Sequence, residues 1–226
     1  MHICLLDIDG TLVLTGGAGQ TAFARALAKE FGIEQIDCGV SFAGRSDRAI
    51  ASDLFDIHGI ELSDENWEQF RVSYLAGLDE ALPTHVGQVL PGVENLLHTL
   101  SARGDVAIGL LTGNVHEAAR RKLMHYGLWH WFPFGGFGDH HVDRCDIAAA
   151  ALSAAQSHLN GSASDISRVL VIGDTLNDIR CGRSIGARCI AVPTGHTPAD
   201  ELLIGNPDLL VPTLEEMGPI LALLDA

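Results

Sequence analysis

Short apolar segments alternate with helical patterns along much of the chain. The segments rich in apolar and β-branched residues occupy positions 2–8, 106–112, 168–174, 188–194 and 208–211. They lack the polar–apolar alternation of a strand with one face in water, so they predict strands of a parallel sheet covered on both faces. Between them, helical patterns occupy positions 115–127, 144–159 and 176–186. This alternation predicts an α/β fold with an open, doubly wound, Rossmann-like parallel sheet.

A long interval without a predicted strand separates the first of these segments from the second. Two apolar stripes at helical spacing lie within it, formed by Phe23, Leu27 and Phe31 and by Trp67, Phe70, Tyr74 and Leu78. Stretches rich in turn-forming residues flank the interval at 15–19 and 83–92. We therefore predict a core domain of residues 1–15 and 88–226, with a helical cap domain of residues 16–87 inserted on a two-stranded hinge.

Composition narrows the class of protein and its location. The 226 residues are 47% apolar and 19% charged, as in a soluble globular protein with one substantial core. No apolar run reaches the roughly 18 residues that cross a bilayer, and no secretory signal precedes the first predicted strand. The five cysteines are odd in number and form no CxxC pair. We expect a cytoplasmic protein with reduced thiols that does not enter a membrane.

The net charge limits the partners. A formal charge of −15 argues against nucleic-acid binding, which depends on Lys and Arg neutralising phosphates. An anionic substrate would need a local cationic pocket, and the chain has only two lysines, Lys29 and Lys122, to contribute to one.

Polar residues follow three of the predicted strands directly. Asp7 and Asp9 end the first apolar run, where burying a charge is costly unless it is paired or bound to a metal. The exits of two later strands carry Thr112, Gly113, Asn114, Asp174 and Asp178. Ligands of open α/β sheets bind beyond the carboxyl ends of the strands, so we expect these side chains to converge on one edge.

Three of these exits, in this order, resemble motifs of the haloacid dehalogenase superfamily of phosphohydrolases. They read DIDGT at 7–11, LLTGN at 110–114 and GDTLND at 173–178. The resemblance covers nearly the whole chain. The helical insert after the first motif is similar to the cap of the phosphoglycolate phosphatase-like branch, which includes β-phosphoglucomutases and phosphonoacetaldehyde hydrolases.

The residues and the resemblance together suggest chemical roles for the aspartates. A carboxylate can attack phosphorus to give an aspartyl-phosphate, and Asp7 is the better-fixed candidate for this nucleophile. Mg²⁺ prefers oxygen ligands, which Asp7 and Asp174 would supply, and the resemblance adds the backbone carbonyl of Asp9. The Asp9 side chain, on the same side as Asp7 in extended geometry, would then act as general acid and base. Asp178 would orient the metal's waters or bind the metal directly, with Asp174 favoured as the direct ligand.

Other motif residues are candidates for substrate binding. Thr112, Gly113 and Asn114 fit a phosphate clamp at the start of a helix, although such a stretch also fits a turn and helix cap. By resemblance, Gly10 and Thr11 of the first motif belong to the same set.

Two arginines complete the candidate site. The resemblance calls for a lysine in a third motif, but the corresponding stretch, 137–152, contains none, and Arg144 is the substitute that we favour over a surface salt bridge. In the cap, Arg45 lies in a glycine-marked loop that by resemblance faces the core site. It could bind the phosphate or a carboxylate of the substrate, or remain solvated.

The sequence therefore predicts a Mg²⁺-dependent phosphomonoesterase for a small phosphorylated metabolite such as phosphoglycolate. We expect a monomer or homodimer whose cap excludes water during phosphoryl transfer. A β-phosphoglucomutase-like transferase and a noncatalytic phosphate- or partner-binding protein remain as alternatives. Asp9 argues against haloacid dehalogenation. Phosphonoacetaldehyde hydrolysis would need a cap lysine, and Lys29 lies on a charged helix face.

Overall fold

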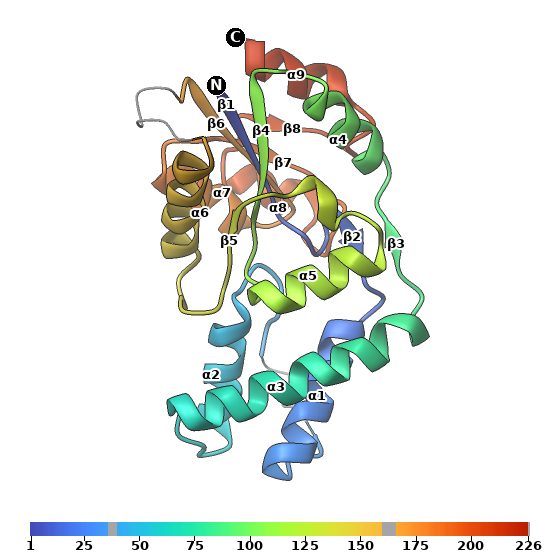
Figure 1. Cartoon of the computed structure of the whole chain (residues 1–226), viewed down its shortest axis with the longest axis vertical. Coiled ribbons are helices and arrows are strands. Elements are labelled where there is room, and N and C mark those ends of the chain that lie inside the picture. The colour runs from blue at the N-terminus through green and yellow to red at the C-terminus, as the bar shows by residue number, and fades with distance from the viewer. Residues whose placement is uncertain (36–39, 160–165, 226) are drawn as a thin grey trace.

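A six-stranded sheet with helices on both faces forms the larger part of the molecule, and a group of three helices extends from one end (Figure 1). The computed structural model describes residues 1–35, 40–159 and 166–225. The strands are β1 His2–Leu6, β2 Val13–Leu14, β3 Gln88–Val89, β4 Val106–Leu111, β5 Gly135–Gly136, β6 Arg168–Gly173, β7 Arg188–Ala191 and β8 Leu209–Leu210. The α-helices are α1 Ala18–Phe31, α2 Asp47–Ile57, α3 Asp64–Ala81, α4 Val93–Ser101, α5 His116–His125, α6 Arg144–His158, α7 Leu176–Ser184, α8 Ala199–Ile204 and α9 Met217–Asp225.

The sheet confirms the predicted α/β fold. Its order is β5-β4-β1-β6-β7-β8, and every pair is parallel. The five predicted strands are present and end slightly earlier than expected. Strand β5 was not predicted, because two glycines carry no hydrophobic pattern.

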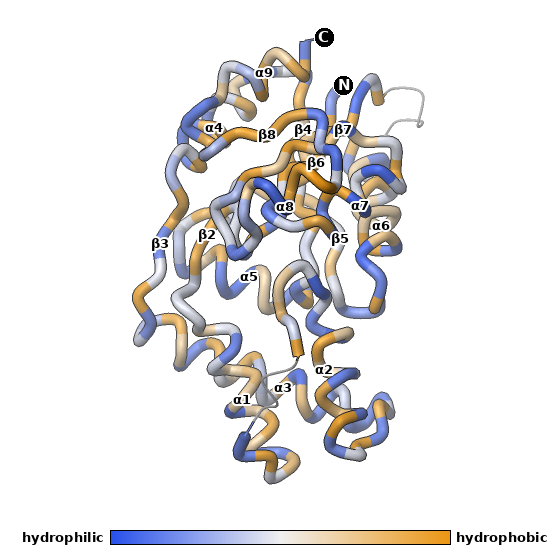
Figure 2. Tube along the Cα trace, turned by 180° about the vertical axis from the view of Figure 1, so that it is seen from behind, coloured by the Kyte–Doolittle hydropathy of each residue, from blue (hydrophilic) through white to orange (hydrophobic). Residues whose placement is uncertain are grey.

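Strand β1 shows why its sequence is an unbroken apolar run. Cys4 and Leu6 pack in one core with helices α4, α5 and α9, whereas Ile3 and Leu5 pack in a second core with α6 and α7. Successive side chains of a strand point to opposite faces, and both faces of this sheet are covered. In Figure 2 the strands β6 and β8 are accordingly hydrophobic, whereas the helices are mixed.

Helices α1, α2 and α3 pack around one hydrophobic core that contains the two predicted stripes and also includes Val115 and Ala118 at the start of α5. Phe23 contacts Phe70 and Tyr74 with ring centroids 5.0 and 4.5 Å apart, and Phe55 packs against Phe70 at 5.7 Å. Where the hinge was predicted, β2 and β3 form a short antiparallel pair. The division into domains at residues 16–87 stays a prediction. No helix in the described ranges is both long and apolar enough to cross a membrane.

Candidate active site

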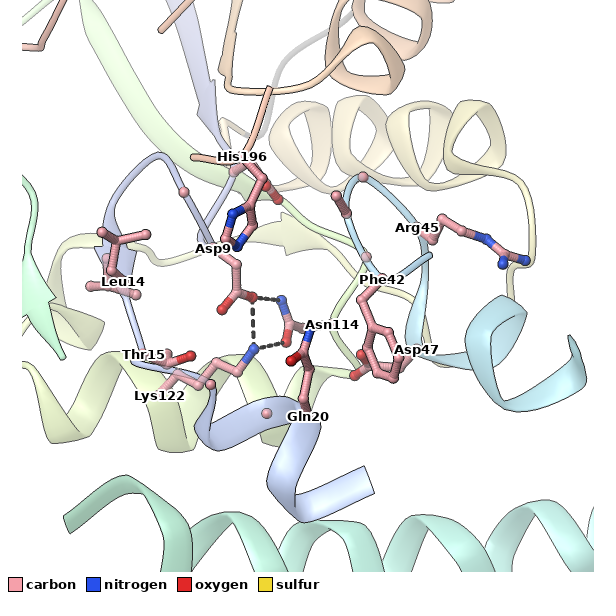
Figure 3. A pocket seen from close by; sticks show the side chains of 18 of the residues that line it. Asp9, Leu14, Thr15, Gln20, Phe42, Arg45, Asp47, Asn114, Lys122 and His196 are labelled. Atoms are coloured by element: carbon pink, nitrogen blue, oxygen red, sulfur yellow. Dashed lines mark hydrogen bonds and ion pairs between the residues drawn. The ribbon is translucent and has the colours of Figure 1, made fainter. Parts of the chain in front are cut away.

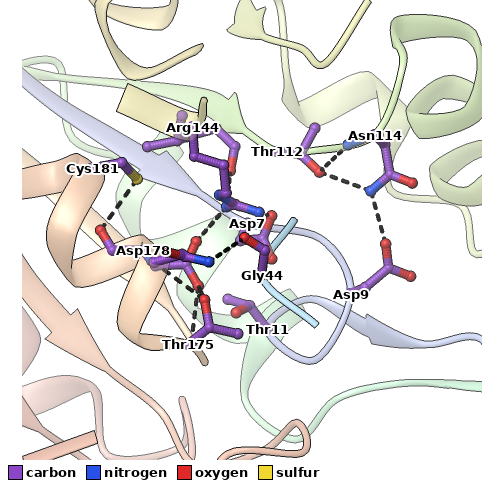
Figure 4. Close-up of polar contacts among 12 residues, drawn as sticks. Asp7, Asp9, Thr11, Gly44, Thr112, Asn114, Arg144, Thr175, Asp178 and Cys181 are labelled. Atoms are coloured by element: carbon purple, nitrogen blue, oxygen red, sulfur yellow. Dashed lines mark hydrogen bonds and ion pairs between the residues drawn. The ribbon is translucent and has the colours of Figure 1, made fainter. Parts of the chain in front are cut away.

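The exits of β1, β4 and β6 lie at one edge of the sheet because the three strands are parallel neighbours. The first exit turns at once, since the Ile8 carbonyl accepts hydrogen bonds from the backbone N–H groups of Leu12 and Val13 at 2.9 and 3.0 Å. That Asp9 lies on the side of Asp7 stays a prediction, and both residues line the same cavity. Asp7 faces Arg144, whereas Asp9 faces Lys122 (Figures 3 and 4).

A buried acidic centre forms where Asp7, Asp174 and Asp178 meet. Each offers a carboxylate oxygen, and these oxygens lie within 4.8 Å of one another. The Arg144 Nη2 donates to Asp7 Oδ1 at 3.2 Å and to Asp178 Oδ1 (Figure 4). Asp178 Oδ2 accepts from the backbone N–H and hydroxyl of Thr175 at 3.0 and 2.6 Å, in a capping box that begins α7. Asp178 therefore orients Arg144 with one oxygen and caps a helix with the other.

Asp174 is engaged more weakly than its neighbours. Its Oδ1 accepts a 3.3 Å hydrogen bond from the buried Thr11 hydroxyl. Gly10, at φ +88°, lies so close that a Cβ there would overlap the Asp174 carboxylate. Asp174 thus keeps its carboxylate directed to the acidic centre and the cavity beside it.

The acidic centre is short of positive charge. Burial raises the pKa of Asp7 to about 7 and that of Asp174 to about 9, and the charge of Asp178 adds to both shifts while Arg144 opposes both. The charge of Asp9 also raises the pKa of Asp7, and that of Asp7 raises the pKa of Asp174. Among the described residues, one guanidinium faces three buried carboxylates here. Hard oxygen donors around a deficit of positive charge fit a divalent cation such as Mg²⁺.

We predict that the metal-free protein becomes less stable as the pH rises from about 5 to 9. The unfolded chain releases the protons of Asp7 and Asp174 near pH 4, whereas the folded state holds them to about pH 7 and 9. The folded state binds more protons in this window, so the free energy of unfolding falls with pH. Thermal unfolding in EDTA, measured across this pH range, checks the prediction. We expect added Mg²⁺ to restore stability most at the alkaline end of the range. A flat profile in EDTA would contradict it.

Lys122 provides a second buried cation, which the sequence analysis noted without assigning it a role. Its Nζ donates to Asp9 Oδ2 and to Asn114 Oδ1, both at 2.6 Å (Figure 3). The Asn114 Nδ2 in turn donates to Asp9 Oδ2 and to Thr112 Oγ1, both at 2.8 Å. A lysine between the buried Ala119 and Leu123 on the inner face of a helix was the available signal.

The predicted residues divide into those that line one cavity and those behind its wall. The cavity, of about 880 Å³, is lined by Asp7, Asp9, Gly10, Arg45, Gly113, Asn114, Arg144 and Asp174. Thr11, Thr112 and Asp178 are buried behind these residues and contact them. Their assigned roles stay predictions. Thr112, in this geometry, supports Asn114.

The loop before α2 closes the cavity by docking on the core. The Asp47 backbone N–H donates to the Gly113 carbonyl, and the Asp47 side chain accepts from the Val115 N–H, both at 2.8 Å. The Ser46 hydroxyl donates to the Val142 carbonyl at 3.1 Å. The Asp47 side chain is buried, which raises its pKa to about 7 against the influence of Lys122 and the Val115 N–H. The sequence analysis passed over Asp47 in favour of its neighbour Arg45.

Arg45 points away from the centre of the cavity. Figure 3 shows this side chain directed away from Asp9 and Lys122. Its guanidinium donates to Asp53 at 2.6 Å and to the Ala49 carbonyl at 3.2 Å, both on α2. A role in substrate binding stays a prediction for Arg45, whose charge is held by Asp53 in this structure.

Comparisons with known proteins agree with this arrangement. Residues 146–217 match the model of the HAD-hydrolase-like family. The chain is 27% identical to the probable phosphatase IndB of Dickeya dadantii, over 95% of this chain and 91% of that protein. It is 25% identical to a phosphoglycolate phosphatase of Agrobacterium fabrum, over 97% and 91% of the two chains.

Solved structures show the same fold over nearly the full length. CbbY from Rhodobacter sphaeroides, in complex with phosphate, superimposes with a TM-score of 0.76 at 17% identity and 96% coverage of both chains.

Proposed function

Since residues 146–217 match the model of the HAD-hydrolase-like family, we propose that this chain is a Mg²⁺-dependent phosphatase that hydrolyses phosphate monoesters of small organic molecules. The observation that supports this most directly is the pairing of two aspartates with two separate cations at one cavity. Asp7 is bound to Arg144, and Asp9 is bound to Lys122. The names of the relatives add phosphatase as the reaction and phosphoglycolate as a first substrate to test.

Asp7 serves as the nucleophile in this proposal. Its carboxylate oxygen forms a bond to phosphorus while the ester P–O bond breaks, which gives an aspartyl-phosphate and an alcohol. Arg144 fixes the Asp7 carboxylate through Oδ1 and leaves it facing the cavity. Water then attacks the aspartyl-phosphate, releases inorganic phosphate and restores Asp7.

Asp9 moves the protons. It donates one to the departing alkoxide and later accepts one from the attacking water. Its side chain is 41% exposed in the cavity, whereas that of Asp7 is 7% exposed, so Asp9 can meet both the alcohol and the water. Lys122 and Asn114 hold its Oδ2 and so fix its orientation.

Asp7, Asp174 and the backbone carbonyl of Asp9 would hold the Mg²⁺. Asp178 would orient these ligands indirectly, through its contact with Arg144. When bound, the cation would neutralise charge on the phosphoryl oxygens. A noncatalytic role loses its main support, because Arg144 contacts Asp7 as a third-motif lysine would.

The test is release of phosphate from p-nitrophenyl phosphate and from a panel of natural phosphate esters, with Mg²⁺ and with EDTA. We expect turnover that requires Mg²⁺. Absence of turnover across the whole panel would reject the proposal. Conversion of β-glucose 1-phosphate to glucose 6-phosphate with little free phosphate would indicate the transferase instead.

A further inference from the structure

The wall of the cavity that faces the acidic centre is apolar and comes mainly from the helical insert. Phe23, Phe42, Ile50 and Tyr74 line the cavity together with the hinge residue Leu14, and Figure 3 labels Phe42 and Leu14. Cavities of several hundred Å³ enclose drug-sized ligands, so about 880 Å³ is far more than a two-carbon phosphate ester fills. The space beyond the phosphate therefore fits an organic group with apolar surface.

Every Lys and Arg side chain that lines the cavity in the described part of the chain is already bound to carboxylate. Arg144 binds Asp7 and Asp178, Lys122 binds Asp9, and Arg45 binds Asp53. The positions that the structure does not describe, 36–39, 160–165 and 226, include no Lys, Arg or His in the sequence. His196 lines the rim above Asp9 and is exposed to solvent.

Asp47 adds negative charge on the insert side of the cavity. Its side chain is 6% exposed, and its Oδ2 accepts a hydrogen bond from the Val115 N–H. It lies beside Tyr74, whose pKa burial raises, with Asp47 adding to the shift by its charge and by hydrogen bonding. Above about pH 7, where most of Asp47 is ionised, Asp47 and Asp9 together outnumber Lys122, so a second anionic group on a substrate would meet net negative charge in this part of the cavity.

We propose that the cavity selects phosphate monoesters whose alcohol portion carries apolar surface and no second anionic group, with Asp47 as the residue that excludes such anions. This selectivity rests on the proposed phosphatase function. It makes phosphoglycolate, with its carboxylate, a poor substrate even though the relative from Agrobacterium fabrum is named for it.

Three two-carbon esters that differ in charge test the selectivity: phosphoglycolate, 2-hydroxyethyl phosphate and O-phosphoethanolamine. We expect kcat/KM for phosphoglycolate to be at least tenfold below that of the other two. Asp47→Asn keeps an oxygen to accept the Val115 hydrogen bond and should narrow this gap by raising kcat/KM for phosphoglycolate. Asp56→Asn removes the same charge from an exposed position of α2 and should leave the gap unchanged.

Two results would overturn the selectivity proposal. One is wild-type turnover of phosphoglycolate equal to that of the uncharged ester. The other is an Arg45→Ala variant that loses phosphoglycolate turnover alone, which would show that Arg45 leaves Asp53 to bind the carboxylate. If no ester, including p-nitrophenyl phosphate, is hydrolysed, the phosphatase proposal fails. In that case the Kd values of the three esters, measured by calorimetry with Mg²⁺, test the selectivity proposal independently of turnover. Equal Kd values would reject it.

Discussion

Replacement of Asp7 by asparagine is expected to lower phosphate release by roughly 10⁴-fold or more, as loss of a covalent nucleophile does in other enzymes. The amide fills the same volume but cannot attack phosphorus. It also removes a charge from the buried acidic centre, where Asp178 repels that charge and the charge itself repels Asp174. The variant should therefore unfold, in EDTA, at a temperature no lower than that of the wild type. Steady-state kinetics and thermal unfolding measure the two effects.

Asp200→Asn provides the matched control for this result. It makes the same chemical change at an exposed position of α8, away from the cavity, and should leave kcat and stability unaltered. Retention of substantial activity by the Asp7→Asn variant would remove Asp7 from the nucleophile role.

Replacement of Arg144 by alanine should impair both activity and stability. Arg144 is 4% exposed and is the cation in contact with Asp7 and Asp178, so its loss leaves buried carboxylates without a partner. Breaking one side of a buried ion pair typically costs about 3–5 kcal/mol of unfolding free energy. We expect kcat to fall by roughly 10²–10³-fold, comparable to the loss of an electrostatic contact in other active sites. Urea unfolding and initial rates at saturating Mg²⁺ measure these losses.

Two companion variants separate the functions of the cations. Arg144→Lys keeps the charge without the planar fork and should recover much of the lost rate. Lys122→Met removes the cation that binds Asp9. Because Asp9 is the proposed acid and base, we expect this variant to change the pH profile of turnover and to affect the rate of attack by Asp7 less. If the Arg144→Ala variant keeps the wild-type rate, another cation performs the role of the missing third-motif lysine. Lys122 would then be the next residue to test.

The fold could be predicted closely because the sheet is parallel and buried on both faces. Strands of that kind appear as continuous apolar runs, and the helices between them have their own periodicity. Strand β5 escaped prediction because its two glycines are placed by pairing with β4 and not by a pattern of their own. Helix α2 had no distinct stripe beyond its glycine-marked start, although Phe55 and Leu54 pack in the core of the insert.

The aspartates of the candidate site could be located from the sequence by one rule. Parallel neighbouring strands end at the same edge, so residues that follow β1, β4 and β6 must meet there. The rule also predicted that Asp174 and Asp178 lie beside Asp7, and carboxylate oxygens of the three residues lie within 4.8 Å of one another. It says nothing about residues on helices that pack against this edge, and this is why the positions of Lys122, inside α5, and Asp47, at the start of α2, were missed.

The sequence by itself determined the sheet, the order of the motifs and the edge at which the acidic side chains gather. Tertiary structure alone decided which cation holds which aspartate. Helix α6 brings Arg144 from one face of the sheet, and α5 brings Lys122 from the other. The turn after Asp7 then directs the two aspartates to different partners, because their directions depend on backbone angles and helix packing that no local pattern encodes.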